Sequence, residues 1–169
     1  MIEFNENGLL PAGILNYTYD DFLTQFLENF PESNTRLNIL KDFRTLIRAV
    51  SQISLPEYIW VDGSFVTSKQ NPNDIDFCYF LDYKNLTDDI FNNITSIFNE
   101  NRGNLKCDPY IAFHIPNSPQ NAEEIRIVNN RNYWRGQFGF DRLDNPKGII
   151  QLDKAQINSI VNGGLSDDE

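Results

Sequence analysis

Two short apolar runs in the middle of the chain, residues 58–61 and 75–81, constrain its fold most. Both are rich in aromatic and β-branched residues, a composition typical of buried strands. The turn Gly63-Ser64 follows the first run, and glycine permits the sharp change of direction that exposes backbone N–H groups. We therefore expect two strands joined by a polar loop, with a turn that is suited to binding phosphate.

Asp74 and Asp76 lie two residues apart at the start of the second run. Because side chains alternate along a strand, both carboxylates fall on one face and Ile75 on the other. Mg²⁺ prefers hard oxygen ligands and is typically held by one or two carboxylates together with substrate phosphates. The spacing thus predicts a site for Mg²⁺, or for Mn²⁺, in nucleotidyl transfer. Alternatively, Asp74 closes a turn and Asp76 protects an edge strand from aggregation.

The order of these features resembles the signature of the DNA polymerase beta-like nucleotidyltransferase superfamily. That signature is a Gly-Ser turn, nine residues, Asp-Ile-Asp and an apolar strand, here Gly63 to Leu81. The chain looks most like a minimal single-domain prokaryotic branch of unknown function, and the resemblance extends over residues 55 to 115. It implies an α/β (α+β) nucleotidyltransferase-like core, with a small mixed β-sheet flanked by helices and two N-terminal helices.

The resemblance also implies an activity and assigns residues to it. The activity is the Mg²⁺-dependent transfer of a nucleoside monophosphate from an NTP to a hydroxyl of an RNA end, a protein or a small molecule. Gly63 and Ser64 match the turn that handles the triphosphate, and Asp74 and Asp76 match the metal ligands. Lys69, in the following loop, could reach the triphosphate as a point charge or could be a solvated loop lysine.

The superfamily uses a third carboxylate, as a metal ligand or as a base, on a strand that follows. Asp108 is the best candidate in this chain, with Asp82 and Asp89 as alternatives. Pro109 removes a backbone donor, which indicates an edge strand or a bulge and leaves open that Asp108 only begins a turn. His114, the only histidine, could take part in proton transfer, but we expect a structural residue at a strand end.

Apolar periodicity predicts the remaining elements. A helix over 18–30 begins with a Thr18–Asp21 capping box, and a second helix over 35–51 has Leu37 on its apolar stripe. A third helix follows Thr87 and stops at Gly103. Further expected elements are a strand at 106–113, an amphipathic or β-prone run at 124–128 and another such run at 148–152.

Length and composition place the chain among small globular proteins. Its 169 residues, of which 40% are hydrophobic, predict one domain over 1–165, with an irregular N-terminal arm at 1–16 and a disordered acidic tail at 166–169. Cys78 and Cys107 have no partner spacing and are expected to be buried in strands, in a reducing compartment. No secretory or membrane-spanning pattern is visible, so we expect a cytoplasmic protein.

The formal net charge of −10 disfavours a broad nucleic-acid surface. Residues 126–147 nevertheless carry five basic and two acidic side chains, a local charge of +3 that leaves −13 elsewhere. Four aromatic residues share the segment, namely Tyr133, Trp134, Phe138 and Phe140. Either this segment stacks on a base and contacts phosphate, or its aromatic residues belong to the core and its arginines pair with local acids.

A non-enzymatic function stays open beside transfer. A chain of this fold could be a catalytically inactive, antitoxin-like or nucleotide-sensing module that acts through a protein partner or as a homodimer. Its acidic balance would suit a basic partner.

Overall fold

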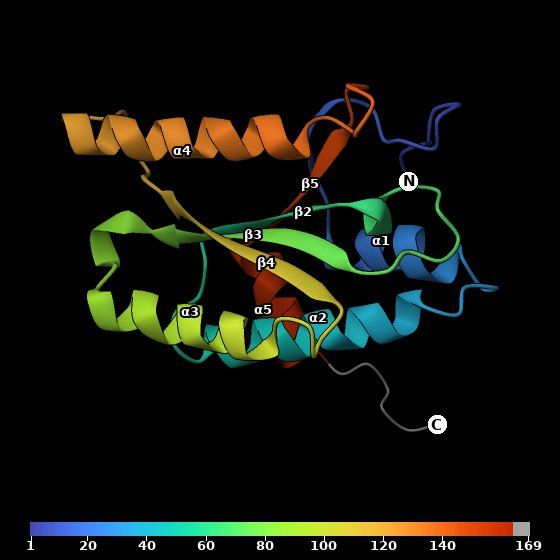
Figure 1. Ribbon diagram of the computed structural model, residues 1–169, viewed down its shortest axis with the longest axis horizontal. Coiled ribbons are helices and arrows are strands. Elements are labelled where there is room, and N and C mark those ends of the chain that lie inside the picture. The colour runs from blue at the N-terminus through green and yellow to red at the C-terminus, as the bar shows by residue number, and fades with distance from the viewer. Residues whose placement is uncertain (164–169) are drawn as a thin grey trace.

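The computed structural model describes residues 1–163 as a five-stranded mixed sheet with helices on both faces (Figure 1). The strands are β1 (Gly13–Asn16), β2 (Tyr58–Asp62), β3 (Ile75–Asp82), β4 (Cys107–His114) and β5 (Gly148–Asp153). The α-helices are α1 (Tyr19–Leu23), α2 (Arg36–Ser51), α3 (Asp88–Asn101), α4 (Ala122–Phe138) and α5 (Lys154–Asn162). The predicted class, a mixed sheet flanked by helices with two helical segments near the N-terminus, is confirmed at this level.

The strand order is β1-β5-β2-β3-β4. The hairpin neighbours β2 and β3 are antiparallel, whereas β3 and β4 are parallel and are connected through α3. The edge position of β4 explains why Pro109 is tolerated there, since a proline cannot donate to a second neighbour. Because β3 lies between β2 and β4, the alternative interpretation of Asp76 as an edge-strand residue is wrong.

Apolar side chains on the two faces of the sheet form two separate clusters. Ile75, Phe77 and Tyr79 of β3 belong to the larger cluster, beneath α2, α3 and α5, while Cys78 and Phe80 belong to the smaller cluster under α4. This alternation follows from the period of two along a strand. It places Asp76, between Ile75 and Phe77, on the α4 face.

The N-terminal helices form largely as predicted. Thr18 caps α1, since its hydroxyl accepts a hydrogen bond from the Asp21 N–H at 3.1 Å, and a π-helical turn over Thr24–Glu28 continues the helix. The second helix begins after Thr35 and ends at Ser51. Leu37 does not lie on its buried stripe but is 45% exposed.

Two expectations need correction, and a third is not tested. The N-terminal arm is not irregular throughout 1–16, because β1 pairs in parallel with β5, from Gly13 opposite Gly148 onward. The run 124–128 is neither short nor a strand but part of the 17-residue helix α4. The expected tail 166–169 lies outside the described residues. Within 1–163, no helix is long and apolar enough to cross a membrane.

Candidate active site

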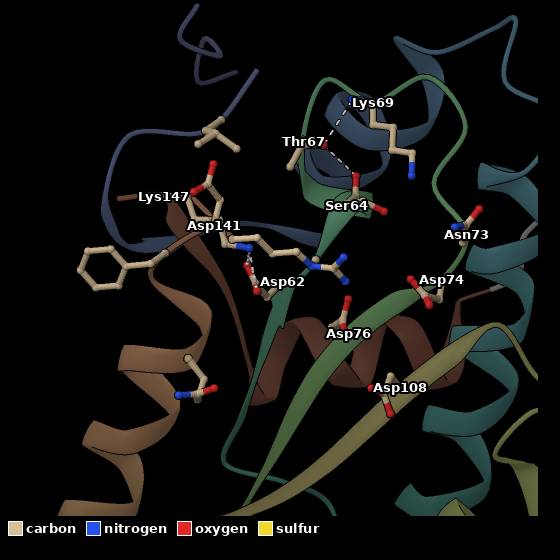
Figure 2. Close-up of a pocket in the computed structure, with 15 residues that line it drawn as sticks. Asp62, Ser64, Thr67, Lys69, Asn73, Asp74, Asp76, Asp108, Asp141 and Lys147 are labelled. Carbon is tan, nitrogen blue, oxygen red and sulfur yellow. Dashed lines mark hydrogen bonds and ion pairs between the residues drawn. The ribbon is translucent and has the colours of Figure 1, made fainter. Parts of the chain in front are cut away.

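A cleft of about 670 Å³ opens where β2 ends and β3 and β4 begin. Its lining includes all six residues that the sequence predicts for the site, namely Gly63, Ser64, Lys69, Asp74, Asp76 and Asp108. Figure 2 shows Asp76 and Asp108 on neighbouring strands and Ser64 and Lys69 on the loop that follows β2. The expected geometry, with both acids of Asp-Ile-Asp in one cleft beside the Gly-Ser turn, is therefore present.

Gly63 holds the turn in a conformation that other residues rarely adopt. Its φ of 80° and ψ of −167° lie in a region that is essentially restricted to glycine. A Cβ atom at this position would also lie 1.8 Å from Asp76 Oδ2. The absence of a side chain thus lets the backbone approach the Asp76 carboxylate, and Ser64 begins a short 3₁₀ turn over Ser64–Val66.

Strand register concentrates carboxylates around Asp76. Asp62 on β2 and Asp108 on β4 are its direct neighbours across the sheet, and Asp74 precedes it by two residues. Burial, followed by the charges of Asp74, Asp62 and Asp108, raises the pKa of Asp76 from 3.8 to about 6, and only Lys147 opposes this rise. A carboxylate in such a position binds either a proton or a cation more readily than usual.

A buried ion pair closes one side of the cleft. Lys147 Nζ lies 2.8 Å from Asp62 Oδ1 and 2.9 Å from its Oδ2, and the two residues are only 9% and 5% exposed. Burial raises the pKa of Asp62 to about 6 against the lowering effect of Lys147. Because a buried ion pair contributes little net stability, its position beside Asp76 suggests a role in the cleft.

Asp108 is held by two neighbours. Its Oδ2 accepts a hydrogen bond from the Tyr110 hydroxyl, and its Oδ1 lies 3.9 Å from Arg102 Nη2. Asp82 instead caps the turn at the far end of β3, and Asp89 is exposed in the first turn of α3. Neither alternative lines the cleft, so Asp108 is the only one of the three candidates that lies beside Asp76.

The loop that carries Ser64 and Lys69 is fixed from beneath by a buried arginine. The guanidinium of Arg36 donates to the carbonyls of Phe26, Phe65, Thr67 and Lys69 at 2.6 to 2.9 Å. Burial lowers its pKa to about 10. Three of these carbonyls belong to the loop and Phe26 belongs to the π-helical turn, so Arg36 ties the loop to that turn. The Lys69 side chain extends from the loop at the cleft.

Sequence reasoning missed several residues that line the cleft. Asp62 and Lys147 are 85 residues apart and are brought together by the pairing of β2 with β5. No local sequence pattern predicts this pairing. Asp62 does stand directly before the Gly-Ser turn, and this position was the available signal. Other residues that line the cleft are Leu9 and Asn73, from two loops, and Gln137, Phe140, Asp141 and Arg142, from α4 and the loop after it. The last four belong to the segment 126–147, which the sequence offers as a surface for a base and phosphates but does not place at the cleft.

Other singled-out residues lie away from the cleft. His114 ends β4, and its ring packs edge-on against Tyr58 with centroids 5.3 Å apart, as expected of a structural residue. Burial lowers its pKa. Cys78 and Cys107 are buried and unpaired in β3 and β4, as predicted.

The donor set of the cleft fits a hard divalent cation. Asp76 has three carboxylates as neighbours and an elevated pKa, which a cation would relieve. Within residues 1–163, no group of three or more His, Cys, Asp or Glu side chains is arranged to hold a metal by itself. A Mg²⁺ site of the nucleotide-dependent kind does not need one, because substrate phosphates and water supply the other ligands.

Comparison with known proteins yields one match. A model of a family of unknown function, DUF6932, matches residues 2–153. No curated protein and no solved structure matches the chain.

Proposed function

This chain belongs to DUF6932, a family of unknown function, and we propose that it is a Mg²⁺-dependent nucleotidyltransferase that moves a nucleoside monophosphate from an NTP to a hydroxyl acceptor. One observation carries the proposal. The adjacent strands β3 and β4 bring Asp74, Asp76 and Asp108 into one cleft, with the Gly63-Ser64 turn after β2 on its wall. A turn for phosphate beside carboxylates for metal is the arrangement that such a transfer requires.

Each group has a role that follows from its position. Backbone N–H groups of the Gly63 turn and the Lys69 ammonium would bind the triphosphate, while Lys147 supplies a buried positive charge beside Asp62. Asp74 and Asp76 would hold Mg²⁺, which when bound neutralises the phosphates and steadies the attacking and leaving oxygens. Lys147 and Arg142 also partly offset the five carboxylates that line the cleft.

The transfer itself is a single displacement at the α-phosphorus. The acceptor oxygen forms a bond to this phosphorus, the bond to the bridging oxygen breaks, and pyrophosphate leaves with the electron pair. The hydroxyl proton passes to Asp108 or to water. Of the two oxygens of Asp108, Oδ2 accepts a hydrogen bond from Tyr110, whereas Oδ1 lies 3.9 Å from Arg102 Nη2, beyond hydrogen-bond distance, so Oδ1 is the oxygen that could take up the proton.

The test uses NTPs labelled at the α-phosphate, Mg²⁺ and a lysate of the host, which contains the acceptor. We expect label to be incorporated into RNA, protein or a metabolite. Asp76→Asn and Asp108→Asn should each reduce incorporation at least about a hundredfold, because each removes charge that stabilises the transition state. The matched control is Asp89→Asn, the same change at an exposed carboxylate outside the cleft, which should retain full labelling.

Two outcomes would contradict the proposal. The first is equal labelling by the parent and the Asp76→Asn variant. The second is no labelling by the parent, while a tagged copy recovers one stoichiometric protein partner with or without Asp76. The second result would favour the catalytically inactive binding module instead.

A further inference from the structure

Helix α4 is packed far less than its length leads one to expect. Only Ile127 and Phe138 among its 17 residues are buried, whereas eight of the 16 residues of α2 are buried. Its main contacts are with β4 and β5, and among residues 1–163 it is the only helix that covers that face of the sheet (Figure 1). A long helix with so narrow a buried stripe leaves most of its surface available to a ligand.

Exposed apolar side chains gather on α4 and on the loop after it, residues 139–147. Seven large apolar residues are exposed within 1–163, and four of them lie here: Ile125, Tyr133, Phe140 and Leu143. Tyr133 is 56% and Phe140 49% exposed. Trp134 and Phe138 do pack inward against Tyr110. The expectation that the aromatic residues of this segment belong to the core thus holds for one pair and is wrong for the other.

The arginines of this segment do not pair with local acids. Within residues 1–163, carboxylates form ion pairs with Arg102, Lys147 and Lys154, and with none of the four arginines of α4 and its loop. Arg131 stacks over Trp60 and donates to the Tyr58 hydroxyl. Arg126, Arg135 and Arg142 are exposed, whereas Lys147 is buried against Asp62. Three guanidinium groups of this segment therefore face outward on a chain whose net charge is −10.

One stripe of α4 leads to the cleft. Arg126, Asn130, Tyr133 and Gln137 follow one another at intervals of four, three and four residues, so they share one side of the helix. Gln137 lines the cleft, as do Phe140 and Arg142 from the loop. From Arg126 to Gln137 the stripe is about 16 Å long, at about 1.5 Å for each residue.

We propose that α4 and residues 139–147 bind the acceptor, a single-stranded nucleic acid whose terminal hydroxyl enters the cleft. Exposed rings offer stacking surfaces for unpaired bases, and guanidinium groups contact the phosphates between them. The bases of a duplex already stack on one another, so their faces are not free to stack on the exposed rings. The carboxylates of the cleft would repel a phosphate group but not an uncharged hydroxyl. The negative cleft therefore suits the terminal hydroxyl of the strand, and the arginines outside it suit the phosphates.

The identity of this acceptor rests on the proposed transfer, but its binding can be measured separately. The probe is a fluorescent single strand of about 10 nucleotides, within the usual site sizes of single-strand binders, titrated without NTP or Mg²⁺ at low ionic strength. RNA and DNA strands and a duplex of the same sequence form the arms. We expect the single strand to bind more tightly than the duplex. A difference in affinity between the RNA and DNA single strands would show whether the protein contacts the 2′-hydroxyl.

Variants of the stripe test the assignment of residues. Tyr133→Ala should weaken binding about fivefold to a hundredfold, as the removal of one stacking ring does, whereas Tyr133→Phe should retain it. Arg126→Gln with Arg142→Gln, at the stripe and at the cleft to which it leads, should weaken binding and lower the salt dependence by about 0.7 for each phosphate that the protein no longer neutralises. The matched control is Lys41→Gln, an exposed charge on α2 at the other face of the sheet, which should change little.

The outcomes separate this inference from the proposed function. If the parent and Asp76→Asn both bind the strand but the parent adds no nucleotide, the proposed binding surface is supported and the proposed transferase activity is contradicted. If a protein or small metabolite is labelled and no strand binds, the proposed binding surface is overturned and the proposed transferase activity is supported. Equal loss of binding in Lys41→Gln and Tyr133→Ala would also overturn the surface.

Discussion

Gly63 faces Asp76 so closely that a methyl group on Gly63 would lie 1.8 Å from Asp76 Oδ2. The turn and the acid pair are therefore one unit, although 12 residues separate them along the chain. A phosphate held by the turn and a cation held by the carboxylate would have to be neighbours.

Gly63→Ala should disable the site and destabilise the protein. The substitution forces a Cβ into Asp76 and into a backbone conformation reserved for glycine, so we expect a loss of about 2–4 kcal/mol. Urea unfolding measures it. Gly136→Ala, in the last turn of α4, is the control, because its Cβ meets nothing within 4 Å; it should stabilise by up to about 0.5–1 kcal/mol. Equal effects of the two changes would contradict the close approach.

Asp76→Asn should stabilise the metal-free protein at neutral pH. The pKa of Asp76 is raised to about 6 in the folded state, so folding favours its protonated form, and stability falls as pH rises from about 4 through 6. Removing the charge should raise Tm by about 2–4 °C at pH 7, for about 1 kcal/mol after solvent screening. The gain should vanish near pH 4. A gain that is constant with pH would refute the electrostatic cause.

Mg²⁺ should stabilise the parent protein through the acid pair. At about 100 times its dissociation constant, a ligand adds about 2.7 kcal/mol, which differential scanning calorimetry detects as a higher Tm. Asp74→Asn/Asp76→Asn should show a much smaller shift. Asp88→Asn/Asp89→Asn, an equal change in charge at exposed positions of α3, should keep the full shift. Identical increases of Tm on adding Mg²⁺ in all three proteins would contradict a metal site at Asp74 and Asp76.

Lys147→Met should be strongly destabilising at neutral pH, because it leaves the buried Asp62 carboxylate without its partner. We expect a loss of about 3–5 kcal/mol. The loss should shrink at pH 5, below the raised pKa of Asp62, where the carboxyl takes up a proton. Adding Asp62→Asn to Lys147→Met should restore much of the stability at pH 7, and a double variant as unstable as the single one would disprove the pairing.

Arg36→Met should destabilise the protein by more than about 3 kcal/mol, since it leaves four backbone carbonyls without their donor. Arg36→Lys keeps the charge but not the planar fork and should cost about 2 kcal/mol. Denaturant unfolding gives both values. Arg126→Gln, at an exposed arginine without a carboxylate partner among residues 1–163, should stay within about 0.5 kcal/mol of the parent. A small effect at Arg36 would mean that the loop does not depend on it.

The sequence was sufficient for elements with a strong period. The strands β2 and β3 and the helices α2 and α3 carry clear apolar patterns, and Thr87 caps α3, so their positions follow from short-range rules. Helix α4 has no such pattern, because its apolar residues do not share one face: Ile127 and Phe138 are buried, whereas Ile125 and Tyr133 are exposed. Residues 13–16 offer only four residues to a strand, and their pairing with β5 is purely tertiary.

The candidate site divides in the same way. The turn and the acid pair lie within 14 residues of one another and could be recognised locally. Asp108 could be named as a candidate, but only the register of β3 with β4 places it opposite Asp76. Asp62 and Lys147 depend on contacts between β2, β5 and the loop before β5, and charge alone does not reveal them.

The pairing of β1 with β5 sets a constraint on how the protein can be made. Strand β1 is synthesised first, yet its only partner in the sheet of residues 1–163 is β5, more than 130 residues later. A nascent chain must therefore keep its first strand unpaired until β5 has left the ribosome, and only then can α1 meet α5. Contacts of such long range slow folding, so the pairing of β1 with β5 would be a late step in the formation of the sheet.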